Sequence, residues 1–177
     1  MDIVDIERLF QSEKAQGVAI IGTDSELIES YAEDLLRWRS ALTPTININV
    51  STYVNAKVFH EALLKELFGA AQDVSFRIPS YILRMLDNSG SELEKFSILA
   101  RSMSRKGYEV LVCLQNFHCV STFYTSANAS DYMHFRERDG SFALLLTSKH
   151  PLIEVEHSSI GHHLDSTLTH SVKEIRV

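Results

Sequence analysis

The fold class is decided by residues 17–39, GVAIIGTDSELIESYAEDLLRWR. The four apolar residues between Gly17 and Gly22 are typical of a strand that is buried on both faces of a sheet. The next segment, 23–39, has apolar residues at helical spacing and a capping box from Thr23 to Glu26. A buried strand followed directly by an amphipathic helix indicates an α/β protein with a parallel sheet.

Similar segments recur along the rest of the chain. The expected strands lie at 18–21, 45–50, 110–114, 143–147 and, more weakly, 172–177. The expected helices lie at 2–14, 23–39, 55–68 with Gly69 as its end, 79–87 and 91–105, and a loop is expected at 121–130. This order predicts a three-layer α/β sandwich around a mainly parallel five-stranded sheet. We expect one domain over 1–177, with 1–14 as a leading amphipathic helix.

Composition excludes several classes of protein. The chain has 177 residues, 45% of them hydrophobic, and a net charge of -6, so it is not collagenous, coiled-coil or disordered. The acidic balance provides no basic field for nucleic-acid phosphates or anionic lipids. No apolar run approaches the ~20 residues that span a bilayer, and the amino terminus does not read as a signal peptide. A disulfide between Cys113 and Cys119 would distort a strand, so we expect a cytoplasmic protein.

Three expected strands, each taken with the residues that follow it, carry a resemblance to a known family. Open parallel sheets bind ligands beyond the carboxyl ends of such strands. The three segments are VAIIG with its capped helix, VLVCLQNFHCV and FALLLTSKHPL. In this order the chain resembles P-loop ATPases of the AAA+ and STAND groups from about residue 15 to residue 177. The resemblance implies a P-loop NTPase-like fold. It rests on the order and character of the elements more than on identical motifs.

The glycine-rich phosphate loop of that family is degenerate in this chain. The family ends the loop in Gly-Lys-Ser/Thr, whereas this chain has Gly22, Thr23, Asp24 and Ser25. The lysine is missing, and residues 15–36 contain five carboxylates and no basic residue. We expect Thr23 to cap the following helix and the acidic side chains to repel phosphate.

The other two family positions lie after the third and fourth strands. Gln115 and Asn116 stand where the family has Asp and Glu for magnesium and for the attacking water. Amides bind a dication more weakly than carboxylates and cannot act as general bases. Thr147 and Ser148 match the polar sensor position, which is kept. The resemblance places the fifth strand at the end of the sequence, so we expect no helical lid.

This pattern of losses favours a catalytically inactive ATPase-like protein without cofactor or metal. We expect a regulatory, adaptor or assembly subunit that acts through protein–protein contacts, for example with a related active ATPase, and that could form oligomers. Direct contact with nucleic acid or membrane is not expected. The candidate partner-facing residues are Phe117, Phe123, Tyr124, Arg136 and Arg138. The two arginines could reach a neighbouring subunit's nucleotide, although Arg-Glu-Arg-Asp is also typical of a solvated helix face.

Two other functions stay open at this point. One is a non-hydrolysing nucleotide or nucleic-acid binding module of the transposition or phage-defence type. The other is an unrelated doubly wound α/β enzyme that uses the same sheet edge, although spacing alone assembles no nucleophile and base there.

Two further clusters of reactive side chains are disfavoured. His157, His162 and His163 make a poor metal set because adjacent side chains rarely ligate one ion. Cys113 is expected to be a buried structural cysteine rather than part of a thiol–histidine pair with His118.

Overall fold

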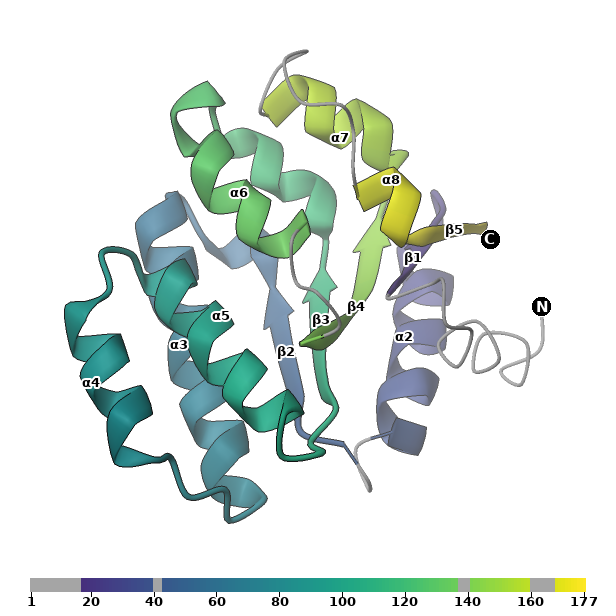
Figure 1. Cartoon of the computed structure of the whole chain (residues 1–177). Coiled ribbons are helices and arrows are strands. Elements are labelled where there is room, and N and C mark those ends of the chain that lie inside the picture. Colours follow the sequence, from purple (N-terminus) through teal and green to yellow (C-terminus); the bar gives the residue numbers. More distant parts are fainter. Residues whose placement is uncertain (1–16, 40–42, 137–140, 160–167) are drawn as a thin grey trace.

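The computed structural model describes residues 17–39, 43–136, 141–159 and 168–177. Five strands form one parallel sheet in the order β2-β3-β4-β1-β5 (Figure 1). They are β1 (Gly17–Ile21), β2 (Thr45–Asn49), β3 (Val110–Gln115), β4 (Phe142–Ser148) and β5 (Lys173–Arg176). All five expected strands are therefore confirmed. The helix expected at 2–14 lies outside the described residues.

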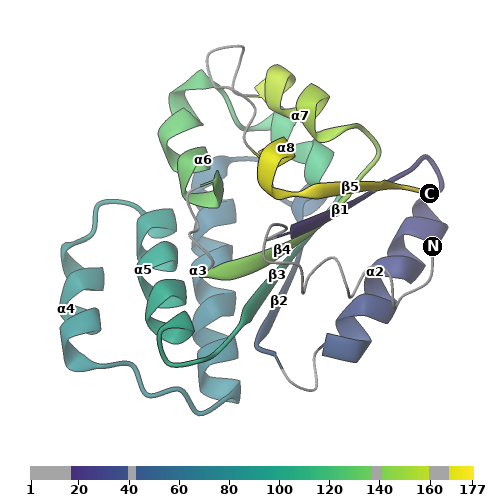
Figure 2. The same cartoon turned by 45° about the vertical axis from the view of Figure 1, so that its right-hand side comes forward.

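Helices cover both faces of this sheet. They are α2 (Ser25–Arg39), α3 (Ala56–Asp73), α4 (Ser80–Asn88), α5 (Glu92–Ser104), α6 (Ala129–Arg136), α7 (Leu152–Ser159) and α8 (Leu168–Ser171). Short 3₁₀ helices lie at η1 (Val50–Thr52), η2 (Phe117–Thr122) and η3 (Ser126–Asn128). In the described part of the chain, α2 alone covers one face, while α3, α5, α6 and α7 cover the other and α4 lies outside α5 (Figure 2). The three-layer α/β fold is thus confirmed.

The uninterrupted apolar sequence of β1 is explained by the helix layers on the two faces of the sheet. Successive side chains of a strand point to opposite faces of the sheet. Val18 and Ile20 join the core beneath α2, whereas Ala19 and Ile21 join the larger core on the other face. Both faces must therefore be apolar, as in β3 and β4.

The alternation of isoleucine and asparagine in β2 has a related cause. This strand lies at the edge of the sheet, and α2 contacts β1 and β4 instead. Ile46 and Ile48 are buried in the larger core, while Asn47 and Asn49 on the opposite face are exposed. The polar face of β2 is therefore the face that no described helix covers, while α3 packs on the apolar face.

Two helix starts agree with the sequence analysis and one helix end does not. The Asn55 Oδ1 atom accepts the Val58 N–H at 2.9 Å, and the Ser91 Oγ atom accepts the Glu94 N–H at 3.1 Å. Gly69 was expected to end α3, but the helix continues to Asp73. The helix continues because buried alanines after the glycine extend its apolar face.

No described helix is long and apolar enough to cross a membrane.

The segment 121–130 is not an open loop, which corrects a second expectation. It forms the end of η2, all of η3 and the start of α6. Phe117, Phe123 and Tyr124 are buried here, and the Tyr124 hydroxyl is hydrogen-bonded to the His60 Nε2 atom. The ring centroids of Phe59 and Phe123 are 5.6 Å apart. These three aromatic side chains form core, so the prediction that they face a partner is wrong.

A buried carboxyl joins α6, α7 and α8. The Glu156 Oε1 atom accepts hydrogen bonds from the Tyr132 hydroxyl at 2.7 Å and from the Leu168 N–H at 3.4 Å. The Oε2 atom has no hydrogen-bond partner in the described structure. Burial raises the pKa of Glu156, and this effect exceeds the lowering by the two hydrogen bonds. The carboxyl therefore connects three helices while its charged form is disfavoured.

We expect Glu156→Gln to increase the free energy of unfolding by about 1 kcal/mol at pH 7. Because the pKa is raised in the folded state, wild-type stability declines as the pH rises from about 4 through that pKa. Glutamine keeps the Oε1 acceptor and stays neutral, so it removes this decline. Urea unfolding followed by circular dichroism at pH 5 and pH 7 would measure the effect. Glu66→Gln, on the exposed side of α3, is the control, and a variant no more stable than wild type at pH 7 would contradict the prediction.

Candidate functional site

The three predicted site segments meet at one edge of the sheet. The turn after β1 is joined to the end of β4, because the Gly22 N–H donates to the Ser148 carbonyl at 3.2 Å. Asn116 follows β3, the neighbour of β4 on its other side. The start of α2 faces these strand ends. This is the edge at which open parallel sheets bind ligands.

The amino terminus of α2 is closed by a carboxylate. The Asp24 Oδ1 atom accepts the N–H groups of Glu26 at 3.1 Å and of Leu27 at 3.2 Å. Asp24, rather than the predicted Thr23, is therefore the cap, and α2 begins at Ser25. The correction has a physical reason, since Asp24 directly precedes the first helical residue. Its charge lies where a helix would otherwise offer free N–H groups to a phosphate.

Gly22 is explained by packing rather than by a phosphate. A Cβ atom at this position would lie 2.6 Å from the carbonyl oxygen of Val177 and 3.4 Å from the Ile28 Cδ1 atom. The Val177 N–H in turn donates to the Ile21 carbonyl at 2.9 Å. The residue after β5 thus approaches the turn so closely that only glycine fits without a shift.

Asn116 ties together the ends of three strands. Its backbone is left-handed, with φ of 55°, a conformation that asparagine tolerates well. Its N–H donates to the Thr147 Oγ1 atom at 2.9 Å, and its Nδ2 group donates to the Asn49 Oδ1 atom at 3.1 Å. Gln115 pairs with Asn49 in the β2–β3 register. A carboxylate at position 116 could not donate this hydrogen bond, so the amide has a structural role.

The two hydroxyls after β4 are also engaged internally. Thr147 and Ser148 are buried, and the Thr147 hydroxyl oxygen accepts the Asn116 N–H. The Ser148 Oγ atom donates to the His150 carbonyl at 2.6 Å and accepts the His150 N–H at 3.1 Å. Neither hydroxyl contacts a general base in the described structure. The pair therefore shapes the turn that follows β4.

A very small cavity remains at the centre of this site. Its volume is about 10 Å³, which holds about one water molecule. It is lined by Ser25, Ile28, Glu29, Asn116, Thr147, Ser148 and Lys149. The structure thus brings together four of the eight predicted positions, while Gly22, Thr23, Asp24 and Gln115 lie around the cavity without lining it. The sequence analysis missed Lys149, whose only signal is that it follows the polar strand exit.

The other reactive side chains form no catalytic pair in the described residues. Burial raises the pKa of the Cys113 thiol to about 12, and it also raises the pKa of Cys119. The His118 Nδ1 atom accepts the Lys149 N–H at 3.2 Å and therefore faces a backbone donor rather than a thiol. Both cysteines are free thiols, and neither is activated as a thiolate. The expectation that Cys113 is a buried structural cysteine is confirmed.

Two further hypotheses depend partly on residues outside the description. No group of three His, Cys, Asp or Glu side chains that could hold a metal occurs among the described residues, and His162 and His163 lie outside them. Arg136 is the last residue of α6, and Arg138 also lies outside the described residues. The proposed role of the two arginines at a neighbouring subunit stays a prediction.

Comparison with known proteins connects this architecture to solved structures. The chain matches no protein-family model, and the comparison with curated proteins finds no match. The Walker-type ATPase of Pyrococcus abyssi superimposes with a TM-score of 0.64 at 11% identity, over 98% of this chain and 52% of that one. This chain has a P-loop ATPase fold.

Two further solved structures give the same result for the fold. The ORC1 protein of Aeropyrum pernix in complex with DNA has a TM-score of 0.61 at 15% identity, over 99% of this chain and 43% of that one. Cdc6p from Pyrobaculum aerophilum has a TM-score of 0.56 at 13% identity, over 97% and 43%. The chain thus spans about half the length of these proteins or less, and the likeness concerns the fold.

We expect Asn116→Asp to lower the free energy of unfolding by about 1 kcal/mol. The substitution removes the Nδ2 donor and places a carboxylate against the Asn49 Oδ1 atom. Asn47→Asp, on the exposed face of β2, adds the same charge and serves as the matched control, with a change below about 0.5 kcal/mol. Thermal and urea unfolding of the three proteins would measure both effects. Equal stability of the two variants would show that the amide of residue 116 has no structural role.

Proposed function

We propose that this protein is a catalytically inactive P-loop ATPase-like subunit that acts through protein–protein contacts as a regulator, adaptor or assembly factor. The observation that carries the proposal is the lack of free space at the edge where the strands end. The cavity there measures about 10 Å³, and the Asp24 carboxylate caps the helix terminus beside it. A phosphate would have to displace this carboxylate against its charge.

The chemistry of the strand ends supports the same proposal. Hydrolysis by this fold needs carboxylates that hold magnesium and orient water. Gln115 and Asn116 offer amides instead, and the Asn116 amide is already bonded to Asn49. Among the described residues that line the cavity, Lys149 is the one with a basic side chain, and it comes from the β4 side. Asn116, Thr147 and Ser148 are engaged in hydrogen bonds at the strand ends.

A related active ATPase is the partner that this proposal favours, because the chain shares its fold with the Walker-type ATPase of Pyrococcus abyssi. The free Cys113 and Cys119 thiols agree with a cytoplasmic location. Oligomers with copies of the same chain are a second form of the same proposal.

A second candidate function is a nucleotide or nucleic-acid binding module without hydrolysis. One solved structure of this fold is the ORC1 protein in complex with DNA, and another is the ADP form of the ORC2 protein of Aeropyrum pernix. The net charge of -6 counts against DNA as the partner of this chain. A gel-shift titration with duplex DNA at low salt separates the two functions, since a shift would favour the binding module.

We expect no heat of binding when the protein is titrated with ATP and magnesium at millimolar nucleotide. An active ATPase of the same fold is the positive control, and an unfolding curve before and after the titration confirms that the protein stayed folded. Binding in the micromolar range would contradict the proposal directly. Weak binding that survives removal of magnesium would instead favour the non-hydrolysing module.

A further inference from the structure

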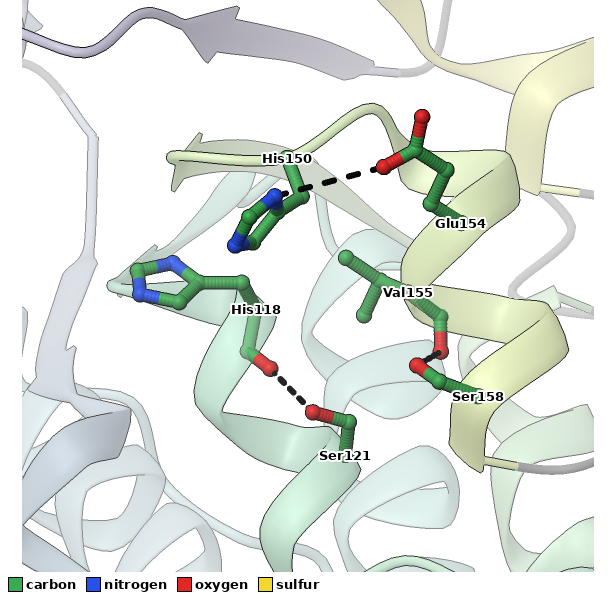
Figure 3. A pocket seen from close by; sticks show the side chains of 6 residues that line it. All are labelled: His118, Ser121, His150, Glu154, Val155 and Ser158. Atoms are coloured by element: carbon green, nitrogen blue, oxygen red, sulfur yellow. Dashed lines mark hydrogen bonds and ion pairs between the residues drawn. The ribbon is translucent and has the colours of Figure 1, made fainter.

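A larger pocket lies beside the closed site. It has a volume of about 340 Å³ and is lined by His118, Ser121, His150, Glu154, Val155 and Ser158 (Figure 3). The first two residues belong to η2, and the last three belong to α7. The two imidazoles lie on one side and the α7 residues on the other, with the Val155 side chain directed between them (Figure 3). The volume is at the lower end of the range for ligand pockets.

Ser121, Ser158 and Glu154 offer hydrogen-bond acceptors to this pocket, whereas His118, whose Nδ1 atom accepts the Lys149 N–H, has an N–H donor at Nε2. The Ser121 Oγ atom donates its proton to the His118 carbonyl at 2.8 Å, and the Ser158 Oγ atom donates to the Val155 carbonyl at 3.0 Å. Since each hydroxyl has one proton, the lone pairs remain for a ligand. The Glu154 carboxylate adds two acceptor oxygens. The lining therefore suits a ligand that brings several donors.

The two imidazoles provide flat faces at the same pocket. The ring centroids of His118 and His150 are 5.6 Å apart, at an interplanar angle of 77°. Burial, with contributions from His150 and Lys149, lowers the pKa of His118, so this ring is neutral at pH 7.5. The His150 Nδ1 atom lies 4.0 Å from the Glu154 Oε2 atom. No set of described side chains could hold a metal ion here.

We propose that this pocket binds an arginine side chain presented by a protein partner. A guanidinium group is planar, carries five donors and stacks on aromatic rings, which matches acceptors and imidazole faces together. Val155, which is 3% exposed, forms the apolar floor of the pocket. An anionic ligand would meet the Glu154 carboxylate.

The guanidinium is favoured over an ammonium for a further reason. The charge of Lys149 lies close enough to contribute to the lowered pKa of His118. The same charge therefore opposes any cation in the pocket and offsets the charge of Glu154. Recognition therefore depends on hydrogen-bond geometry and stacking more than on net charge. The choice of a protein as the source of the arginine rests on the proposed function, whereas the preference for guanidinium does not.

Nuclear magnetic resonance titration at pH 7.5 tests the preference with the peptide acetyl-Gly-Arg-Gly-amide and ¹⁵N-labelled protein. We expect saturable shifts of the amides of Ser121, Val155 and Ser158. The citrulline peptide, in which a carbonyl oxygen replaces one NH₂ group of the guanidinium and so removes donors, and the lysine peptide should bind more weakly. Equal binding of the three peptides, or no shift with the arginine peptide, would overturn the proposal.

Substitutions of exposed residues test where the peptide binds and leave the core unchanged. Glu154→Gln should weaken binding about threefold to fivefold, because the carboxylate is exposed and its pairing is correspondingly modest. Glu66→Gln, on the exposed side of α3, is the control and should leave binding unchanged. An unchanged affinity in Glu154→Gln would overturn the assignment to this pocket. If the peptide binds but no protein partner is found by co-purification, the pocket stands and the proposed function fails.

Discussion

Burial of β1, β3 and β4 on both faces is the constraint on which the rest of the structure depends. These strands can satisfy their backbone groups only by pairing, and they can hide both sets of side chains only between α2 and the opposite helices. Parallel pairing then brings all their carboxyl ends to one edge. The residues at those ends, which are polar in each case, become neighbours although they are far apart in the sequence.

At this edge, the chain satisfies its polar groups with one another. The Asp24 carboxylate accepts two N–H groups at the start of α2, and Asn116 donates to the hydroxyl oxygen of Thr147 and to the side-chain oxygen of Asn49. Such bonds stabilise the ends of the strands, and they leave a cavity for about one water molecule. The same side chains that join the strand ends thereby leave little free space at this edge of the sheet.

The expectations from sequence failed at two kinds of position. At some, neighbouring residues can play the same role, and at others, contacts with distant segments decide whether a side chain is buried or a helix continues. Thr23 and Asp24 can both cap a helix, and only the helix start distinguishes them. Gly69 is a helix breaker by propensity, but α3 continues because its apolar face does. Phe117, Phe123 and Tyr124 follow a strand in a segment rich in turn-forming residues, yet all three are buried. The last two pack against Phe59 and His60 of α3.

The amino-acid sequence by itself determined the five strands, the order of most helices and the residue types that follow the strand ends, because each of these depends on local pattern and residue type. Only the tertiary structure decided what those residues contact. The bond from Asn116 to Asn49, the fit of Gly22 against Val177 and the pocket between η2 and α7 all join segments that are distant in the chain. Contacts of this kind depend on the packing of whole layers, which no local pattern contains.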